Sequence, residues 1–564
     1  MATPVETRPI FRPAAEIFLA GGSGSSSRFL HTPTLAKAVG GVIGRPRTLA
    51  RTSASLTGQL VQVARGRSKV QPPRSDKRFA DVAWTENGLF RRLMQTHVAV
   101  EQAVNELLDE ADLSWRADRQ ARYIVSNLFA AISPTNFPLT NPAVLKRAID
   151  TGGQNFVAGA RRFAKDMSSE PRLPTTVDVD AFEVGRDLAV TPGEVVYRDD
   201  VVEILQYGSQ TDTVYERPVL IVPPTINKYY VLDLAPGRSF AAHLLEAGMQ
   251  VFMVSWRNPD ASCAAYDLDT YAQSIIDARR VVSEVSGSDD VHIVGACSGG
   301  IVSCAALGVL KARGELEGVK SITLLVCALD SSEAGTTSAL VGHENAAAAV
   351  ALSAKRGYLD GRSLTEVFAW LRPNDLIWRY VVDNYLLGNP LPAFDILYWN
   401  QDTVRLSAGL HYDFVKLALD NALIRPGAQR VLGKPVDLRA VDIDSYVLAG
   451  SADHIVPWES AYRSTRILGG TKRFVLSTSG HIQALVNPPH PKSRSTFRVG
   501  ETSDTPDDPT VWVEDAKLEN GSWWGDHAHW LIERSGERVP APDELGSAEH
   551  PSIGAAPGVY VLQD

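Results

Sequence analysis

The sequence from Val291 to Gly300 reads Val-His-Ile-Val-Gly-Ala-Cys-Ser-Gly-Gly, an apolar run followed by small residues around one cysteine. The apolar run predicts a buried strand, and the small residues predict a sharp turn that opens a helix at Ser298. A Gly-x-Cys-x-Gly frame of this kind is the nucleophile-elbow pattern, in which a strained turn lies so close to neighbouring backbone that only glycines fit beside it. We therefore predict that Cys297 is a catalytic nucleophile.

The position of Cys297 at the start of a helix supports this role. The helix dipole and the free N–H groups of the first turn favour a thiolate there. The backbone N–H of Ser298 is then expected to be one donor of an oxyanion hole. The alternative is that Cys297 is a small buried hydrophobe, as most free cysteines are. We expect that structural role for the cysteines that lack the glycine frame, namely Cys263, Cys304 and Cys327.

The elbow belongs to a series of short apolar runs that alternate with helix-length segments such as Ser239–Glu246 and Tyr271–Val285. This rhythm is typical of a doubly wound parallel sheet. Two apolar runs at 195–197 and 201–207 precede the series and predict a hairpin. The predicted strands of the series are Val219–Val222, Val251–Val254, Val291–Val294, Ser321–Val326, Ser445–Ala449 and Arg473–Leu476.

The rhythm stops between about residues 331 and 441, which is too long for an ordinary connection and predicts an inserted subdomain. By fold analogy, α/β-hydrolases carry a lid at this place. Before the sheet, apolar residues at helical spacing from Leu89 to Leu108 and the Asn141-Pro142 pair each predict a helix. The expected fold is an α/β-hydrolase fold over 206–564 with a lid insertion, preceded by a mainly helical N-terminal domain over 79–205.

Residues 1–78 differ in composition from the rest of the chain. Residues 17–75 contain nine Lys and Arg but no acid, and Gly and Ser fill positions 21–27. Such a segment has few apolar side chains to offset the entropy of ordering, so we predict a disordered extension. It is a solvated tail, a contact for a partner or an anionic surface, or an organellar transit peptide, and the sequence leaves these alternatives open.

The composition of the whole chain narrows the class of protein. Its 564 residues have 44% hydrophobic content and a net charge of −9, and no apolar run approaches the roughly 18 residues of a membrane span. The N-terminus lacks the pattern of a secretory signal. Four cysteines do not form a disulfide framework, and no metal-ligand spacing is present. We expect a cytoplasmic protein without a membrane span, a metal or a nucleic-acid partner.

The partners of the nucleophile follow it in the chain order that this fold uses, acid first and histidine second. Asp453 and His481 each lie in a loop directly after one of the last two predicted strands. Asp453 would hold the tautomer and orientation of the imidazole, and His481 would take the thiol proton. Asp330 is a rival acid, and His454 is a rival base or a residue that shapes the pocket.

A cysteine in place of the usual serine indicates the kind of reaction. Attack by a thiol on a thioester exchanges one thioester for another at nearly equal energy. The resulting acyl-enzyme can pass its acyl group onwards, so transfer is favoured over simple hydrolysis.

Five stretches of the chain carry a likeness to a known family: Pro223–Leu234, Ser255–Asp260, Phe394–Asn400, Ser479–Gln483 and Gly521–Trp524. They resemble the class I polyhydroxyalkanoate synthases, and the likeness extends from about Arg78 to the C-terminus. The resemblance implies a polymerase of (R)-3-hydroxyacyl-CoA, with 3-hydroxybutyryl-CoA as the expected monomer. The enzyme would release CoA and grow a polyester on the Cys297 thiol, with no cofactor beyond its coenzyme A thioester substrate.

The resemblance also implies roles for particular residues. The catalytic roles carry over to Cys297, Asp453 and His481, and the family's aspartate is thought to help activate the 3-hydroxyl of the substrate. Arg372 matches an arginine linked to the CoA phosphates, for which a guanidinium is well suited, although a salt bridge within the lid is the alternative.

Two lid residues and one loop donor complete the expected site. Trp399 and Asp402 align with lid residues near the buried site, with core packing as the alternative for Trp399. We expect the second oxyanion donor in the loop after Pro224, and we prefer the N–H of Ile226 to that of Thr225.

The resemblance further implies a lid that opens for substrate, a homodimer, and attachment to the growing polyester granule in the cytoplasm. The basic extension before Phe79 matches no motif of the family. Two other functions remain as alternatives: a cysteine-nucleophile hydrolase or thioesterase, and a non-catalytic granule-associated protein.

Overall fold

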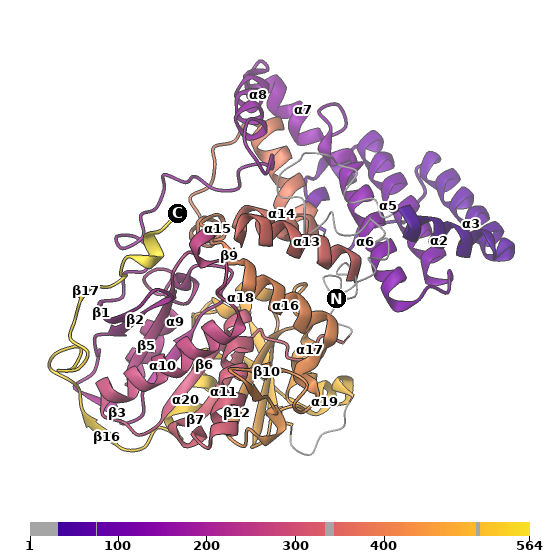
Figure 1. The fold of residues 1–564 in the computed structure, drawn as a ribbon. Coiled ribbons are helices and arrows are strands. Elements are labelled where there is room, and N and C mark those ends of the chain that lie inside the picture. The colour runs from indigo at the N-terminus through magenta and orange to yellow at the C-terminus, as the bar shows by residue number, and fades with distance from the viewer. Residues whose placement is uncertain (1–31, 75, 333–342, 503–507) are drawn as a thin grey trace, which may run out of the picture. The chain divides into compact units, whose positions relative to one another are not determined.

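The computed structural model describes residues 32–74, 76–332, 343–502 and 508–564 (Figure 1). The chain forms two compact units, and each is described by itself. Of the described residues, the helical unit comprises those up to Asp178 together with 343–349 and 362–392. The sheet unit comprises the described residues from 179 to 332, from 350 to 361 and from 393 to 564.

The helical unit is built from amphipathic helices with ordinary caps. The helix predicted from Leu89 to Leu108 is α5, and the Asn87 side chain accepts hydrogen bonds from the backbone of its first turn. Asn141 caps α7 in the same way, with Pro142 in the first position, as predicted. The main helices are α2 (Thr32–Ile43), α3 (Pro46–Ala64), α4 (Ala83–Glu86), α5 (Gly88–Asp109), α6 (Trp115–Ala131), α7 (Pro142–Asp150) and α8 (Gln154–Met167).

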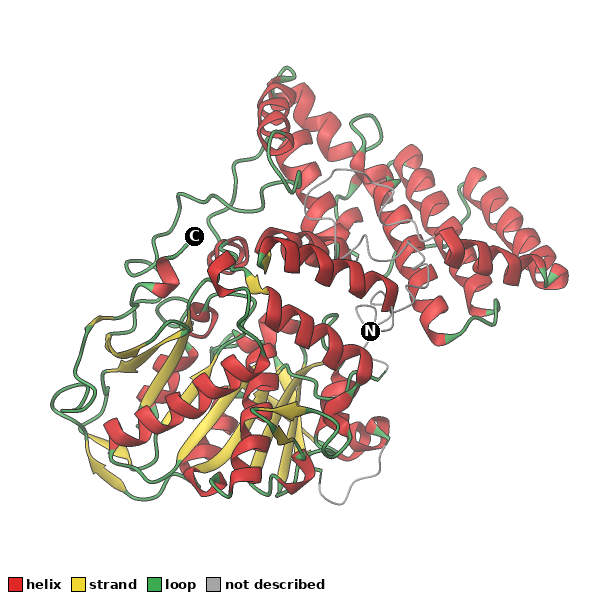
Figure 2. Cartoon of the chain, viewed as in Figure 1, coloured by secondary structure: helices red, strands yellow, loops and turns green. Residues whose placement is uncertain are grey.

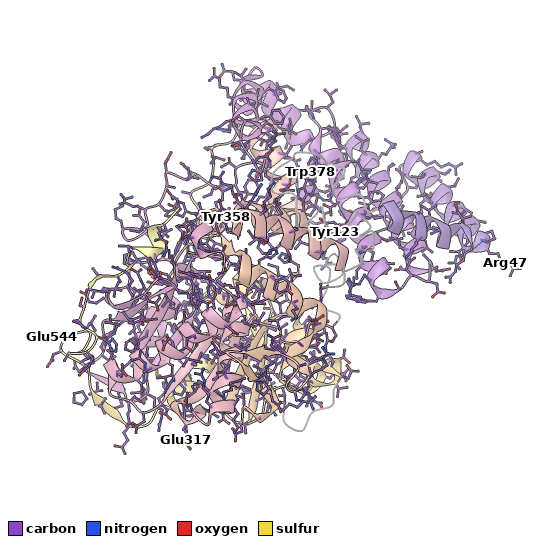
Figure 3. All side chains as sticks on the ribbon, in the orientation of Figure 1. Arg47, Tyr123, Glu317, Tyr358, Trp378 and Glu544 are labelled. Carbon is purple, nitrogen blue, oxygen red and sulfur yellow. The ribbon has the colours of Figure 1, made fainter. Side chains whose placement is uncertain are left out.

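Helices α2 and α3 correct the prediction that residues 1–78 are disordered. Residues 1–31 lie outside the described residues, but 32–64 are almost entirely helical. One charge of the basic segment is paired with an acid of a later helix: Arg51 and Thr48 of α3 both bind the Glu110 carboxylate at the end of α5. Val63 is buried, whereas Arg47 projects from α3 into solvent (Figure 3). Composition alone could not reveal these partners, because they lie about 60 residues further along the chain.

The sheet unit has one large sheet, and each strand predicted from the apolar runs is present. Within the described residues its strand order is β15-β14-β13-β12-β7-β6-β4-β5-β2-β1-β17, and neighbours from β5 to β13 run parallel. The strands are β1 (Gly193–Arg198), β2 (Val202–Tyr207), β4 (Val219–Val222), β5 (Val251–Trp256), β6 (Val291–Ala296), β7 (Val319–Leu325), β12 (Asp444–Gly450), β13 (Lys472–Ser477), β14 (Thr496–Glu501), β15 (Lys517–Asn520) and β17 (Gly554–Ala555).

The expected domain boundaries need two corrections. The β1–β2 hairpin, which we had assigned to the helical domain up to residue 205, belongs to the sheet unit, because β2 is buried throughout and pairs antiparallel with β5. The insertion between β7 and β12 does not form one subdomain. Its residues 362–392 group with the helical unit, where the Tyr385 hydroxyl donates to the Asp166 carboxylate at 2.7 Å.

The segments of the insertion are helical for the most part. In the helical unit they are α14 (Gly361–Leu371) and the π-helical turns η7 (Asn374–Trp378) and η8 (Val381–Leu386). In the sheet unit they include α15 (Asp395–Gln401) and α16 (Ala408–Asp420). In the helix α13 (His343–Arg356), residues 343–349 group with the helical unit and residues 350–356 with the sheet unit.

Helices cover both faces of the large sheet (Figure 2). On one face α10 (Leu268–Ser286) packs against α11 (Ser298–Arg313), and on the other α9 (Phe240–Glu246) packs against α20 (Trp524–Ile532). A large hydrophobic core includes the layer between the sheet and the second pair, where Phe240, Tyr446 and Trp523 are almost fully buried. In the described ranges, no helix is both long and apolar enough to cross a bilayer.

Two buried histidines in the sheet unit predict acid sensitivity. Burial lowers the pKa of His292 and of His527 to about 3. Their unfolded pKa is about 6.5, so below that pH the unfolded chain binds protons that the folded chain excludes, and stability falls as pH falls. The slope is up to about 1.4 kcal/mol per pH unit for each histidine.

We expect a His527→Gln variant to lose less stability than the parent when the pH falls from 7.5 to 5, because glutamine does not titrate but can still bond to Thr323. The urea midpoint, followed by tryptophan fluorescence, measures this difference. His529→Gln, on the exposed side of the same helix, is the control and should behave like the parent. Equal losses in His527→Gln and the parent would show that His527 does not contribute.

Candidate active site

The turn between β6 and α11 has the strained backbone that its sequence predicts. Cys297 has φ 48° and ψ −120°, a conformation that a residue with a Cβ rarely adopts and that costs roughly 1–3 kcal/mol. Its backbone N–H donates to the carbonyl of Leu325 in β7 at 2.8 Å. The neighbouring strand therefore holds the turn in place.

The glycines of the frame allow the close approach of backbone on both sides of Cys297. A Cβ on Gly295 would lie 2.6 Å from the Cα of Gly300. A Cβ on Gly299 would collide with the carbonyl oxygens of Val222 and Pro223 at the end of β4. Backbone atoms cannot move away as a flexible side chain can, so these positions need glycine.

Burial distinguishes Cys297 from the other cysteines. Cys297 is partly exposed, whereas Cys263, Cys304 and Cys327 are buried, and all four are free thiols. Burial raises the pKa of Cys304 to about 12 and that of Cys327 well above its ordinary value. These two side chains therefore remain neutral thiols and pack as small hydrophobes, as predicted.

The loops after β12 and β13 bring together the predicted acid and base. His481 Nδ1 lies 2.6 Å from Asp453 Oδ2, which fits an N–H donated to the carboxylate. The other carboxylate oxygen of Asp453 accepts from the backbone N–H groups of Ile455 at 2.8 Å and Val456 at 3.0 Å. The Asp453 side chain is completely buried, so its orientation and that of the imidazole are determined by these bonds.

The electrostatics of His481 favour its role as proton acceptor for Cys297. Burial by itself lowers the imidazole pKa, but the Asp453 carboxylate and the Cys297 side chain raise it, and the net pKa is about 10. An imidazole with a raised pKa holds the proton that it takes from the thiol.

The rival residues have other positions. Asp330 is salt-bridged to Arg463 at 3.3 Å, and its Oδ1 accepts from Ser332 and from the Asn421 amide. The hydrogen bonds of Asp330 are therefore made to two residues of the insertion, Ser332 and Asn421. His454 lies beside Asp453 in the same loop, but the ring that binds the Asp453 carboxylate is that of His481.

The loop after β4 contains the candidates for the second oxyanion donor. The N–H of Thr225 donates to Ser298 Oγ at 2.9 Å, so it is already occupied. Within the described residues, the N–H groups of Ile226 and Ser298 donate no hydrogen bond. The assignment of Ile226 as the second donor stays a prediction. The Ser298 side chain, for which the sequence suggested no role, ties the loop to the helix.

Three further predicted residues have distinct surroundings. Trp399 is 1% exposed, belongs to the apolar cluster on which Cys297 packs, and donates its indole N–H to the carbonyl of Lys228 at 2.8 Å. Asp402 forms an ion pair with the Lys228 ammonium at 2.7 Å. Arg372 is exposed and pairs with Asp375 in the helical unit, and its CoA contact stays a prediction.

The tail motif Gly521–Trp524 supports the helix that carries His481. This short helix, α18 (His481–Leu485), begins at the predicted catalytic base, His481. The indole N–H of Trp523 donates to the carbonyl of Ala484 at 2.7 Å, and that of Trp524 donates to Leu485 at 3.1 Å. The tail therefore fixes the far end of the helix.

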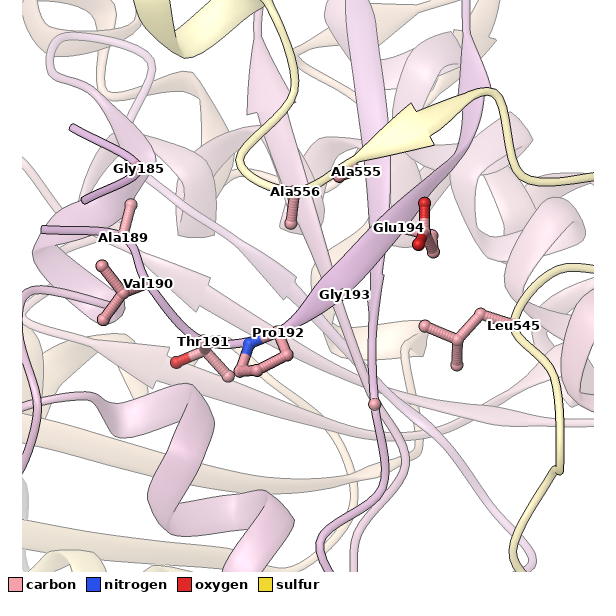
Figure 4. A pocket seen from close by; sticks show the side chains of 11 residues that line it. Gly185, Ala189, Val190, Thr191, Pro192, Gly193, Glu194, Leu545, Ala555 and Ala556 are labelled. Carbon is pink, nitrogen blue, oxygen red and sulfur yellow. The ribbon is translucent and has the colours of Figure 1, made fainter.

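A cavity of about 330 Å³ lies elsewhere in the sheet unit, between the segment before β1 and the chain near β17 (Figure 4). Its walls include Thr191, Pro192 and Ala556. None of the residues of the triad lines it, so it is separate from the site described above.

The sheet order, the elbow and the order of acid and histidine are those of the α/β-hydrolase fold, and a model of that fold matches residues 218–488. The model described as "Poly-beta-hydroxybutyrate polymerase (PhaC) N-terminus" matches residues 75–244. Poly(3-hydroxyalkanoate) polymerase 1 of Ectopseudomonas oleovorans is 44% identical over 504 residues, which is 89% of each chain. The polymerase subunit PhaC of Cupriavidus necator is 40% identical over 88% of this chain and 85% of its own length. The chain belongs to the poly(3-hydroxyalkanoate) polymerase family.

We expect Asp453→Asn to slow alkylation of Cys297 by iodoacetamide at pH 7. Loss of the carboxylate lowers the His481 pKa, so the imidazolium that stabilises the thiolate becomes less populated. The rate constant for alkylation at pH 7 should therefore be lower in Asp453→Asn than in the parent.

The buried Cys263, Cys304 and Cys327 make the label selective, and Cys297→Ala is the blank. Equal rate constants for the parent and Asp453→Asn at pH 7 would show that the carboxylate does not control the Cys297–His481 pair.

Proposed function

We propose that this chain polymerises (R)-3-hydroxyacyl-CoA, with 3-hydroxybutyryl-CoA as the expected monomer, and releases CoA. The observation that carries the proposal is a partly exposed cysteine on a strained elbow, whose side chain interacts with a histidine that is itself bound to a buried carboxylate. Membership of the polymerase family gives this acyl-transfer site its substrate class.

In the acylation step Cys297 attacks the thioester carbonyl. His481 takes the thiol proton, and the N–H groups of Ser298 and Ile226 stabilise the oxyanion of the tetrahedral intermediate. When the intermediate collapses, the bond to the CoA sulfur breaks and His481 returns the proton to the leaving thiolate. The acyl group is then held as a thioester on Cys297.

In the elongation step the 3-hydroxyl of one unit attacks a thioester, an oxygen ester forms, and a thiol is released. We assign removal of the hydroxyl proton to His481. Both carboxylate oxygens of Asp453 are engaged, with His481 on one side and two backbone N–H groups on the other, and the side chain is fully buried. These contacts favour an orienting and electrostatic role for Asp453 over direct contact with the substrate hydroxyl.

The sulfur of Cys297 suits repeated transfer. Exchange between two thioesters is nearly balanced in energy, whereas the formation of each oxygen ester from a thioester is favourable and drives chain growth. A serine in the same position would form an oxygen ester with the enzyme and lose this advantage. The same chemistry distinguishes a polymerase from a thioesterase, in which water accepts the acyl group.

Three finer points are part of the proposal and come from the family resemblance: the class I subtype, action as a homodimer, and attachment to polyester granules in the cytoplasm. A role of Arg372 at the CoA phosphates has the same origin. The basic helices α2 and α3 precede the region that the family model matches, which starts at residue 75.

The purified chain is expected to convert (R)-3-hydroxybutyryl-CoA into free CoA and insoluble polyester in parallel. Cys297→Ala should reduce both by at least about 10³-fold, because triad members act as a unit. Cys297→Ser should also lose most of the activity. CoA release is measured with a thiol reagent and polymer by chromatography after hydrolysis.

Free 3-hydroxybutyrate as the sole product would contradict the polymerase and favour a thioesterase. Polymer formation by Cys297→Ala at the parent rate would show that Cys297 is not the nucleophile and favour a non-catalytic role at the granule.

A further inference from the structure

The loop that follows β4 is joined to the end of α15 by four separate interactions. Both segments belong to the sheet unit, although about 170 residues separate them in the chain. They are also two of the stretches that carry the resemblance to the family, Pro223–Leu234 and Phe394–Asn400.

Asp402, the residue directly after α15, makes two of these interactions. Its Oδ1 lies 2.7 Å from the Lys228 ammonium, and its Oδ2 accepts from the Tyr230 hydroxyl at 2.8 Å. The indole N–H of Trp399 donates to the carbonyl of Lys228, and Asn227 forms an antiparallel bridge with Thr403. The loop is therefore bound to the end of α15 through the Lys228 ammonium and carbonyl, the Tyr230 hydroxyl and the backbone of Asn227.

The Lys228–Asp402 ion pair is largely shielded from solvent. A shielded pair costs more free energy to separate than an exposed one, so it constrains the position of the loop more strongly. The Lys228 side chain is 6% exposed and that of Asp402 is 23% exposed. A buried ammonium that loses its partner is strongly disfavoured, so the lysine and the backbone that carries it follow the position of Asp402. Burial and the Asp402 charge raise the pKa of Tyr230, which keeps its hydroxyl a neutral donor.

We propose that Asp402 is a positioning residue for acyl transfer, which acts through Lys228 and Tyr230 to hold the N–H of Ile226 at the oxyanion position. The inference rests on the proposed function and gives Asp402 a role other than the contact with substrate or CoA that the resemblance suggested. Ile226 is two residues from Lys228, and on its other side Thr225 is bound to Ser298. The free N–H thus lies between two fixed points.

The same helix offers a matched control at its other end. Asp395, the first residue of α15, forms an ion pair with Arg238, which lies twelve residues after Ile226. Both pairs connect α15 to the chain that follows β4. Only the Asp402 pair joins the helix to the residues beside the oxyanion donor.

The test compares two reactions of the Cys297 thiol in Asp402→Asn, Tyr230→Phe and Asp395→Asn. Acylation by a p-nitrophenyl ester, measured as the burst of nitrophenolate, needs the oxyanion hole. Alkylation by iodoacetamide needs the thiolate but forms no oxyanion. A displaced donor costs about 10²-fold, so we expect Asp402→Asn to slow acylation by roughly 10- to 100-fold and leave alkylation within about twofold of the parent.

Tyr230→Phe removes one hydroxyl and should slow acylation by a smaller factor, about three- to tenfold, with alkylation again unchanged. Asp395→Asn should leave acylation within about twofold. If Asp402→Asn does not fold, Tyr230→Phe carries the test alone, because it leaves the ion pair intact.

Two results would overturn the proposal: acylation at the parent rate, or acylation and alkylation that fall together, which would mean general disturbance of the site. An equal loss in Asp395→Asn would do the same, since anchoring of α15 would then be the cause. The ester burst uses no CoA substrate, so its result does not depend on whether the chain is a polymerase. A chain that makes no polymer but shows the selective loss retains the positioning role.

Discussion

The strained backbone of Cys297 is the constraint on which the rest of the site depends. A residue with a Cβ stays at φ 48° only where surrounding contacts hold it there. Here the Leu325 carbonyl accepts a hydrogen bond from the Cys297 N–H, and the end of β4 and the start of α11 lie in close contact with the glycines of the turn. The strain exposes the thiol above the sheet and leaves the Ser298 N–H free. The central strands and the glycines are thus part of the catalytic arrangement.

Around this turn, the other groups are held by bonds from distant parts of the chain. Asp453 fixes His481 from one loop, and the tryptophans of Gly521–Trp524 fix the helix that begins at His481. Ser298 and Asp402 fix the two sides of the loop that contains Ile226. Precise placement of these groups before substrate arrives is what makes an electrostatic site effective.

Much of the fold and site could be predicted because the signals are local. The elbow is a run of ten residues, the central strands are continuous apolar runs, and Asp453 and His481 each follow such a run. Three features could not be predicted: residues 32–64 form the helices α2 and α3, the β1–β2 hairpin belongs to the sheet unit, and the insertion is divided between the two units. These features depend on contacts between segments that are far apart in the sequence, such as Arg51–Glu110 and β2–β5.

The sequence by itself was enough to predict the candidate nucleophile, its candidate acid and base, and the chemistry that a thiol supports, since these predictions follow from residue types at fixed places after strands. Only the tertiary structure decided how the oxyanion loop is held. Asp402 and Lys228 carry no local pattern, and neither does the Ser298 side chain. Their roles arise because folding brings residues about 170 positions apart within hydrogen-bonding distance and shields them from water.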